Sequence, residues 1–215
     1  MSLFADSWAR AWSALALQPA PDLQDALLRA WGEAQRHYHT QQHLQECLAH
    51  FAGAWHLAAR PGEVEIVLWF HDAIYEVKAS DNEARSADWA DAALAQAQAP
   101  AEVRQRVREL IMATCHSAQP EGADAQLVVD IDLAILGAAP ERFAQYDAQV
   151  REEYAWVPGL VYRMKRKAVL KDFLARERIY GTAHFHERLE AQARANLTRA
   201  VGGQARDPAH ERKAP

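Results

Sequence analysis

The sequence has little of what several protein classes require. Its two cysteines, Cys47 and Cys115, form neither a CxxC motif nor a disulfide framework, so reduced thiols are expected. No apolar run approaches the ~20 residues that are needed to span a bilayer. The first residues contain an early aspartate and no continuous apolar segment, so no signal peptide is predicted. We therefore expect a cytoplasmic protein without a membrane partner.

Positive charge is in the minority and is not concentrated in a block. The chain has 24 Lys and Arg residues against 29 Asp and Glu residues, a net charge of −5, and no long basic block. This balance disfavours nucleic acid as the main partner, although it leaves room for a local basic pocket. The signatures GxSxG, GxxxxGK[ST] and HExxH are missing, as is a GxGxxG placed after a strand. The chemistry must therefore lie in other residue patterns.

Residue composition indicates the fold class. Ala, Leu, Glu, Gln and Arg dominate, and β-branched residues are sparse, which favours helix almost throughout. A length of 215 residues suits one substantial domain. We predict a single all-α domain, a helical bundle, over residues 1–201. A polar tail over residues 202–215 has no apolar periodicity and is predicted to be disordered.

Turn residues and caps divide this domain into helices. Trp8, Trp12 and Leu15 have the spacing of one buried helix face. Ser80 and Glu83 have the pattern of a capping box, in which two side chains bond the free amides of a helix start. The main predicted helices run from near Thr40 to Pro61-Gly62, from Glu63 to about Tyr75, from Ser80 to about Gln98, from Asp124 to Leu136, and, as two amphipathic helices, from about Gly159 to Ala175 and from His184 to Ala200.

The adjacent pair His71-Asp72 is the most informative feature of the chain. It ends the strongly apolar run VEIVLWF, so both side chains are expected at the edge of a core, where polar groups need partners. A metal ion would be such a partner. The alternative interpretation is a polar end of a buried helix.

A histidine-rich segment, RHYHTQQHL, precedes this pair. Within it, His43 is the best candidate ligand, because it lies in a predicted helix beside the apolar residues Leu44 and Leu48. His39 lies one turn earlier and could share the same helix face. The alternative for His39 is a residue at the helix start that bonds the backbone.

A second acidic segment, VVDIDLAILG, follows the pair. Asp130 and Asp132 point about 200° apart on a helix, so they cannot both face one metal ion well. We predict that Asp132 is the ligand, because it directly precedes the apolar residues Leu133 and Ile135. The alternative is that both carboxylates cap a short helix.

Other polar residues are candidates for supporting roles. Glu83 is the first candidate for proton transfer, although the capping box would also explain it. His116, at the end of an apolar helix, could be a further ligand, a proton donor or a partner of the helix dipole. Among many cations in the C-terminal third, Arg151, Lys165 and Arg166 are the candidates for binding a phosphate group.

The order of these residues resembles that of a known superfamily. His43, His71-Asp72 and Asp132 on successive predicted helices resemble the HD superfamily of metal-dependent phosphohydrolases. The segments RHYHTQQHL, LWFHDAIYEVKASDNEARSA, VVDIDLAILG, YDAQVREEYAWVP and RKAVLKDFLARERIYGT are similar to a small bacterial family of predicted HD phosphohydrolases. Together they extend over residues 36–182, which is most of the chain.

The resemblance implies a helical bundle around one divalent metal ion bound by His43, His71, Asp72 and Asp132. It also implies hydrolysis of a phosphomonoester, phosphodiester or pyrophosphate bond, with a nucleotide as the expected substrate. Mn, Mg, Fe, Co and Ni are the candidate metals. The sequence lacks the additional histidine pair of dinuclear members, so one metal is expected.

We expect Asp72 both to bind the metal and to orient the attacking water. Arg151 or a cation among residues 165–167 would neutralise charge on the phosphoryl oxygens. The partner is then a small phosphorylated molecule, and self-association stays open. Two alternatives remain: a catalytically silent protein that binds metal and nucleotide and regulates a partner, and a purely structural role of the His and Asp residues.

Overall fold

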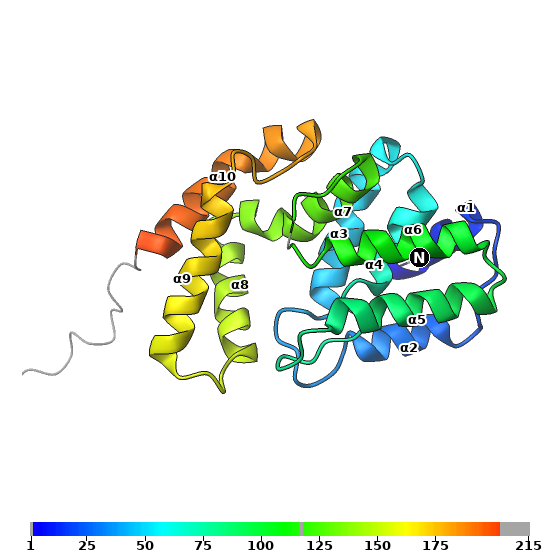
Figure 1. Cartoon of the computed structure of the whole chain (residues 1–215), viewed down its shortest axis with the longest axis horizontal. Coiled ribbons are helices and arrows are strands. Elements are labelled where there is room, and N and C mark those ends of the chain that lie inside the picture. The colour runs from blue at the N-terminus through cyan, green and yellow to red at the C-terminus, as the bar shows by residue number, and fades with distance from the viewer. Residues whose placement is uncertain (1, 117, 203–215) are drawn as a thin grey trace, which may run out of the picture.

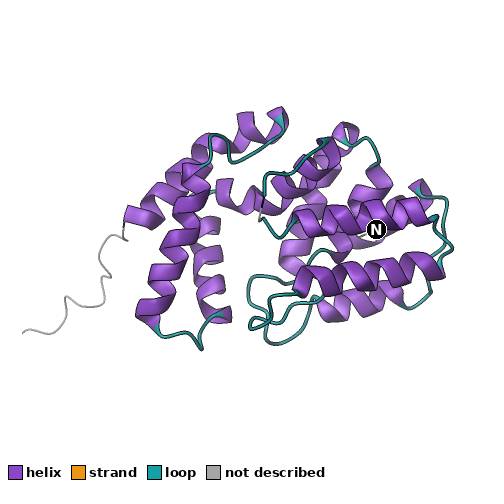
Figure 2. Cartoon of the chain, viewed as in Figure 1, coloured by secondary structure: helices purple, strands orange, loops and turns teal. Residues whose placement is uncertain are grey.

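The computed structural model describes residues 2–116 and 118–202, and these residues form helices, turns and loops without a strand (Figures 1 and 2). The predicted all-α class is therefore confirmed. The α-helices are α1 Leu3–Ala14, α2 Leu23–Ala30, α3 Gln41–Ala54, α4 Pro61–Phe70, α5 Asn82–Gln96, α6 Ala101–Ala113, α7 Ala123–Asp132, α8 Pro140–Glu153, α9 Gly159–Ala175 and α10 Ala183–Gly202. Two 3-10 helices, η1 Trp55–Leu57 and η2 Leu133–Gly137, directly follow α3 and α7.

Helix α4 is the centre of the bundle. Every residue from Gly62 to Phe70 is buried, and the helix packs against α1, α3, α5, α6 and α7. A helix that is apolar on all sides is expected inside a protein, and the run VEIVLWF has this property. The helix ends earlier than predicted, because the chain turns after Phe70 and His71 is its C-cap. The core therefore fixes the position of the His71-Asp72 pair.

The starts of α3 and α5 have different causes. Thr40 is the N-cap of α3, as predicted, and its Oγ1 accepts a hydrogen bond from the N–H of Gln42 at 3.3 Å. The predicted capping box of Ser80 and Glu83 is wrong, because α5 begins at Asn82 without a side-chain cap. The Asn82 amide instead accepts from the N–H of Glu76 and donates to its carbonyl, both at 3.0 Å. These two bonds close the preceding loop and determine where α5 begins.

The helices α8, α9 and α10 lie together at one end of the molecule (Figure 1). Helix α10 packs against α9 and η2. Asn196 donates to the carbonyls of Leu136 and Ala138 at 2.9 Å, and the Tyr180 hydroxyl donates to the carbonyl of Leu133 at 3.1 Å. These bonds fasten the end of α7 and all of η2, and they thereby hold the backbone that carries Asp132.

The bounds of α9 agree with the prediction, but its predicted apolar face does not behave as expected. Leu170 is the only one of its residues that is fully buried, while Leu160 and Met164 are 65% and 67% exposed. Helix α10 includes Gly202, which was predicted to belong to the tail; the rest of the predicted tail, residues 203–215, lies outside the described residues. Among the described helices, none is both long and apolar enough to cross a lipid bilayer.

A close backbone approach at Gly137 gives a stability prediction. A Cβ atom at this position would lie 2.6 Å from the Cβ of Leu189 and 2.9 Å from the Tyr180 hydroxyl. We expect Gly137→Ala to lower the free energy of unfolding by about 1–3 kcal/mol, because η2 must move away from α10. Urea denaturation followed by circular dichroism measures this change.

Gly53 supplies the matched control. It lies inside α3, and a Cβ there would meet nothing within 4 Å. Gly53→Ala should therefore raise the free energy of unfolding by about 0.5–1 kcal/mol, as alanine does inside a helix. Equal stability of the two variants would contradict the close packing at Gly137.

Candidate metal centre

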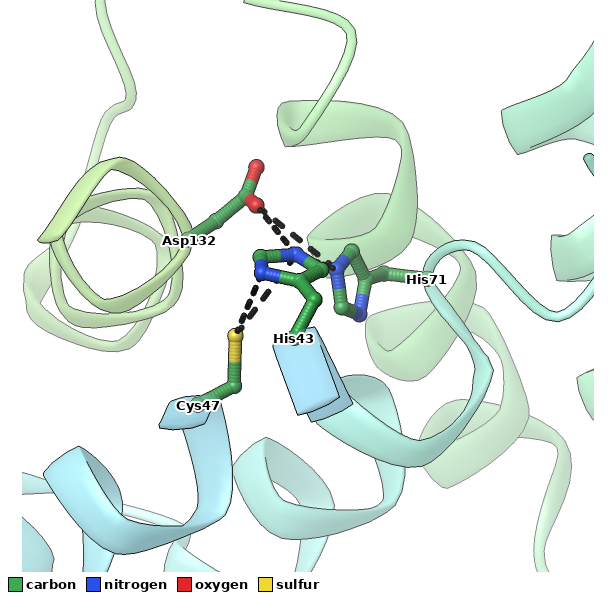
Figure 3. Close-up of side chains that lie close together, drawn as sticks. All are labelled: His43, Cys47, His71 and Asp132. Atoms are coloured by element: carbon green, nitrogen blue, oxygen red, sulfur yellow. Dashed lines mark hydrogen bonds and ion pairs between the residues drawn. The ribbon is translucent and has the colours of Figure 1, made fainter. Parts of the chain in front are cut away.

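Four side chains from three distant segments of the sequence meet near the ends of α4 and α7. Nε2 of His43, on α3, lies 3.1 Å from Oδ1 of Asp132, and Nε2 of His71 lies 3.7 Å from the same oxygen (Figure 3). Oδ2 of Asp72 lies 3.4 Å from Nε2 of His71 and 4.0 Å from Nε2 of His43. The structure thus brings together the four residues expected to be ligands.

Hydrogen bonds and ring packing fix the orientation of the two imidazole rings. Nδ1 of His71 lies 2.9 Å from the carbonyl of Leu68, to which it donates, so in the neutral ring Nε2 is the nitrogen with the free electron pair. Nδ1 of His43 lies 3.1 Å from the hydroxyl of Tyr38. The ring of Trp31 packs beside both imidazoles, at centroid distances of 5.4 Å from His71 and 6.1 Å from His43. Both Nε2 atoms therefore face one point next to Asp132.

The electrostatics of this point favour a cation. The two Nε2 atoms are only 3.3 Å apart, and both rings are buried. Burial lowers the pKa of His71, but the negative charges of Asp72 and Asp132 outweigh it and raise this pKa to about 9. Burial raises the pKa of Asp132, but hydrogen bonds from His116, His43 and His71 outweigh it and hold this pKa well below its ordinary value. Two imidazoles and two carboxylates are a donor set that fits a divalent metal ion.

Cys47 belongs to the same cluster and was not anticipated from the sequence. His43, Cys47, His71 and Asp132 each offer one ligand atom within 4.8 Å of the others, so this cluster could hold a metal ion (Figure 3). The Cys47 thiol lies 3.7 Å and 3.8 Å from the two ring nitrogens of His43, and so lies against this ring. Burial raises its pKa well above the ordinary value, which keeps the thiol protonated. Its position one helical turn after His43 was the available sequence signal.

His116 also contacts the cluster. Its Nε2 lies 2.9 Å from Oδ2 of Asp132, on the oxygen opposite to the one that faces His43. Its backbone has a left-handed φ of 53°, which is uncommon for a residue with a side chain. His116 thus contacts a candidate ligand, and its predicted roles as a further ligand, a proton donor or a partner of the helix dipole stay predictions.

The other predicted site residues lie elsewhere. The Arg151 guanidinium donates to the carbonyls of Tyr154 at 2.6 Å and Val157 at 3.2 Å, and it thereby ties the end of α8 to the following loop. Arg166 pairs with Asp147 at 3.0 Å.

Lys165 is exposed. The negative charge of Glu83 contributes to raising the pKa of Cys115 and of Tyr154. Over the two described segments, Glu83, Arg151, Lys165 and Arg166 form no hydrogen bond or ion pair with the four candidate ligands. Their predicted roles in catalysis and substrate binding therefore stay predictions.

A cavity of about 210 Å³ reaches the centre from the side of α8 and α10. Its wall includes His43, Cys47 and Asp132 together with Glu46, Arg142 and Leu189. Glu46 and Arg142 pair at 2.7 Å and 2.9 Å, so their charges balance within this wall. Asp72 does not line this cavity, but its side chain is 14% exposed and can be reached from solvent.

Comparisons of the chain with protein-family models, with curated proteins and with solved structures gave no significant match. The interpretation of the centre therefore depends on its geometry and on the sequence motifs.

Proposed function

We propose that the protein is a metal-dependent phosphohydrolase of the HD superfamily. The observation that carries this proposal is the convergence of His43 from α3, His71 and Asp72 from the end of α4, and Asp132 from the end of α7 onto a single point. The proposed ligands are these four residues, and the proposed cofactor is one Mn, Mg, Fe, Co or Ni ion. The motifs RHYHTQQHL, WFHDAIYEV and VVDIDLAILG, which resemble that superfamily, support the same interpretation.

A divalent metal ion at this point would polarise a phosphoryl oxygen and lower the pKa of a bound water. The residues of the chain have defined parts in this proposal. Asp72 is exposed enough to contact and orient the attacking water, whereas the rings of His43 and His71 are buried and lie behind it. Arg151, Lys165 and Arg166 are the proposed cations for the phosphate of the substrate, and Glu83 is a proposed proton-transfer residue. The proposed substrate is a small phosphorylated molecule, in the first place a nucleotide.

The test is a screen of the purified protein against phosphate monoesters, diesters and nucleotides, with Mn, Mg, Co and Ni added in turn. Elemental analysis of the same preparation measures metal per chain. We expect close to one metal ion per chain and turnover of at least one substrate class. Metal and nucleotide binding without turnover would instead indicate a regulatory protein, and protein that retains no metal would contradict the proposed centre.

A further inference from the structure

A buried glutamate far along the chain holds the segment that precedes α3. The side chain of Glu153, the last residue of α8, has no exposed surface. Its Oε1 accepts hydrogen bonds from the backbone N–H groups of His37 at 2.9 Å, Tyr38 at 2.8 Å and His39 at 3.0 Å. Its Oε2 accepts from the hydroxyl of Tyr75 at 2.9 Å. One carboxylate thus fixes the backbone that leads into the candidate centre.

The same carboxylate also orients an imidazole. Nδ1 of His39 donates a hydrogen bond to Oε2 of Glu153 at 2.8 Å, so Nε2 is on the far side of the ring. The ring stacks on Tyr75, with centroids 4.1 Å apart and an interplanar angle of 26°. A second contact, edge to face, comes from Tyr38 at 4.8 Å. The ring of His39 therefore has one defined orientation.

Nε2 of His39 faces the centre but lies too far from Asp72 for a hydrogen bond. Its distance from Oδ2 of Asp72 is 4.0 Å. The His39 side chain is 21% exposed, while His43 and His71 are 2% and 1% exposed. A substrate that approaches Asp72 from solvent would therefore meet Nε2 of His39. A buried carboxylate behind an imidazole with a free outer nitrogen is the arrangement that proteins use for proton transfer.

We propose that His39 is a catalytic residue that gives a proton to the leaving oxygen of the substrate, and that Glu153 is the positioning residue that holds it there. This inference rests on the proposed phosphohydrolase function. It names His39 as the proton donor in place of Glu83, which forms no hydrogen bond or ion pair with the candidate ligands within the described residues.

The proposed step balances as follows in protons and bonds. Water forms a bond to phosphorus through its oxygen, and the bond between phosphorus and the leaving oxygen breaks with its electron pair on that oxygen. The proton on Nε2 of His39 passes to the leaving oxygen, so an alcohol departs. The attacking water loses a proton to solvent and His39 regains one from solvent. The sum is ester plus water to alcohol plus phosphate.

The experiment compares two probes that differ in how much their leaving oxygen needs a proton. Phenyl phosphate has a poor leaving group, and 4-nitrophenyl phosphate has a good one. We expect His39→Asn to lower kcat on phenyl phosphate by about 10²–10³-fold, and on 4-nitrophenyl phosphate by less than about tenfold. Metal per chain should stay at the wild-type value, because His39 is not a proposed ligand.

The chain offers matched controls for both residues. The side chain of His37, two residues earlier, is exposed, and its Nδ1 pairs with the exposed Glu152 at 3.1 Å. His37→Asn and Glu152→Gln should therefore leave both rates unchanged. Glu153→Gln should follow the pattern of His39→Asn. Nuclear magnetic resonance of protein with ¹⁵N-labelled histidine gives a second readout. The Nδ1 resonance of His39 is assigned by its loss in His39→Asn. Glu153→Gln should shift this resonance, and Glu152→Gln should leave it unchanged.

Several results would overturn this inference. An equal loss on both probes, or no loss on either, would show that His39 does not protonate the leaving oxygen. Loss of metal in His39→Asn would make His39 a ligand instead. A selective loss on phenyl phosphate in Glu83→Gln, and not in His39→Asn, would return the role to Glu83. Wild-type protein that holds metal but hydrolyses neither probe nor any nucleotide would overturn the proposed function, and the role of His39 with it.

Discussion

Replacing Asp132 by asparagine is expected to empty the metal centre while leaving the helices in place. The side chain contacts His43 and His116 through its two oxygens, at 3.1 Å and 2.9 Å. Removing its charge leaves Asp72 as the only carboxylate among the four proposed ligands. Changes to residues that merely support a ligand cost about 10–100-fold in metal affinity, so the loss of a ligand charge should cost at least about 100-fold.

Asp130 provides the control, because it is two residues away and has a structural role. Its oxygens accept from the N–H of Gly181 at 2.7 Å and from the N–H and hydroxyl of Thr182 at 2.7 Å and 2.6 Å. Asp130→Asn places an amide group among these donors. It should lower the free energy of unfolding by about 1–3 kcal/mol and leave the metal content unchanged.

Elemental analysis and thermal unfolding of the two variants test this pair of expectations together. Asp72→Ala should resemble Asp132→Asn in its metal content. If Asp130→Asn loses the metal while Asp132→Asn keeps it, the wrong carboxylate has been assigned to the centre. Wild-type metal content in Asp72→Ala would remove this residue from the ligand set.

Replacing Arg10 by methionine is expected to cause a large loss of stability. Glu65 lies in the middle of α4 with a fully buried side chain, and it accepts hydrogen bonds from both Nε and Nη2 of Arg10 and from the hydroxyl of Ser7 at 2.6 Å. Without Arg10, a buried carboxylate keeps only one neutral donor. We expect a loss of about 3 kcal/mol at neutral pH, near the low end for such pairs because the Arg10 side chain is 34% exposed.

The same variant should show a defined pH dependence. Burial already raises the pKa of Glu65 above its ordinary value of 4.5, in spite of its hydrogen bonds. Loss of Arg10 raises this pKa further, so the folded state of the variant takes up a proton at a pH where the unfolded state does not. The stability deficit relative to wild type is therefore fully present above the raised pKa and shrinks as pH falls towards 4.5.

Urea denaturation of both proteins at about pH 7 and about pH 5 measures this effect through the midpoint of unfolding. Arg85→Met is the matched control. Arg85 pairs with Glu76 at 2.9 Å, but the side chains are 40% and 60% exposed. This change should cost little stability at either pH, because exposed ion pairs contribute little. A similar cost for Arg10→Met would mean that water or another group compensates the buried charge of Glu65.

The sequence alone determined the helical class and most helix positions, because these depend on short-range signals. Thr40 predicted the start of α3, and the run VEIVLWF predicted the helix α4. The capping signal failed where a hydrogen bond to a residue further away in the chain competes with it. Asn82 bonds the backbone of Glu76, and this loop closure overrides the capping box expected for Ser80.

The composition of the centre was accessible from the sequence only in part. His43, His71, Asp72 and Asp132 could be selected because each lies at a recognisable boundary between apolar and polar residues. Their meeting at one point could not be deduced from periodicity, since it requires α3, α4 and α7 to pack in one particular arrangement. Cys47 joins the cluster through the same packing.

The environment of His39 was decided by tertiary structure alone. Glu153 lies 114 residues further along the chain, and in the sequence it is one of two adjacent glutamates with no visible difference between them. In the folded protein, Glu152 is exposed and Glu153 is buried against five hydrogen-bond donors. Local patterns report which face of a helix is apolar. Which distant carboxylate reaches a given imidazole depends on how the end of α8 packs against the segment before α3.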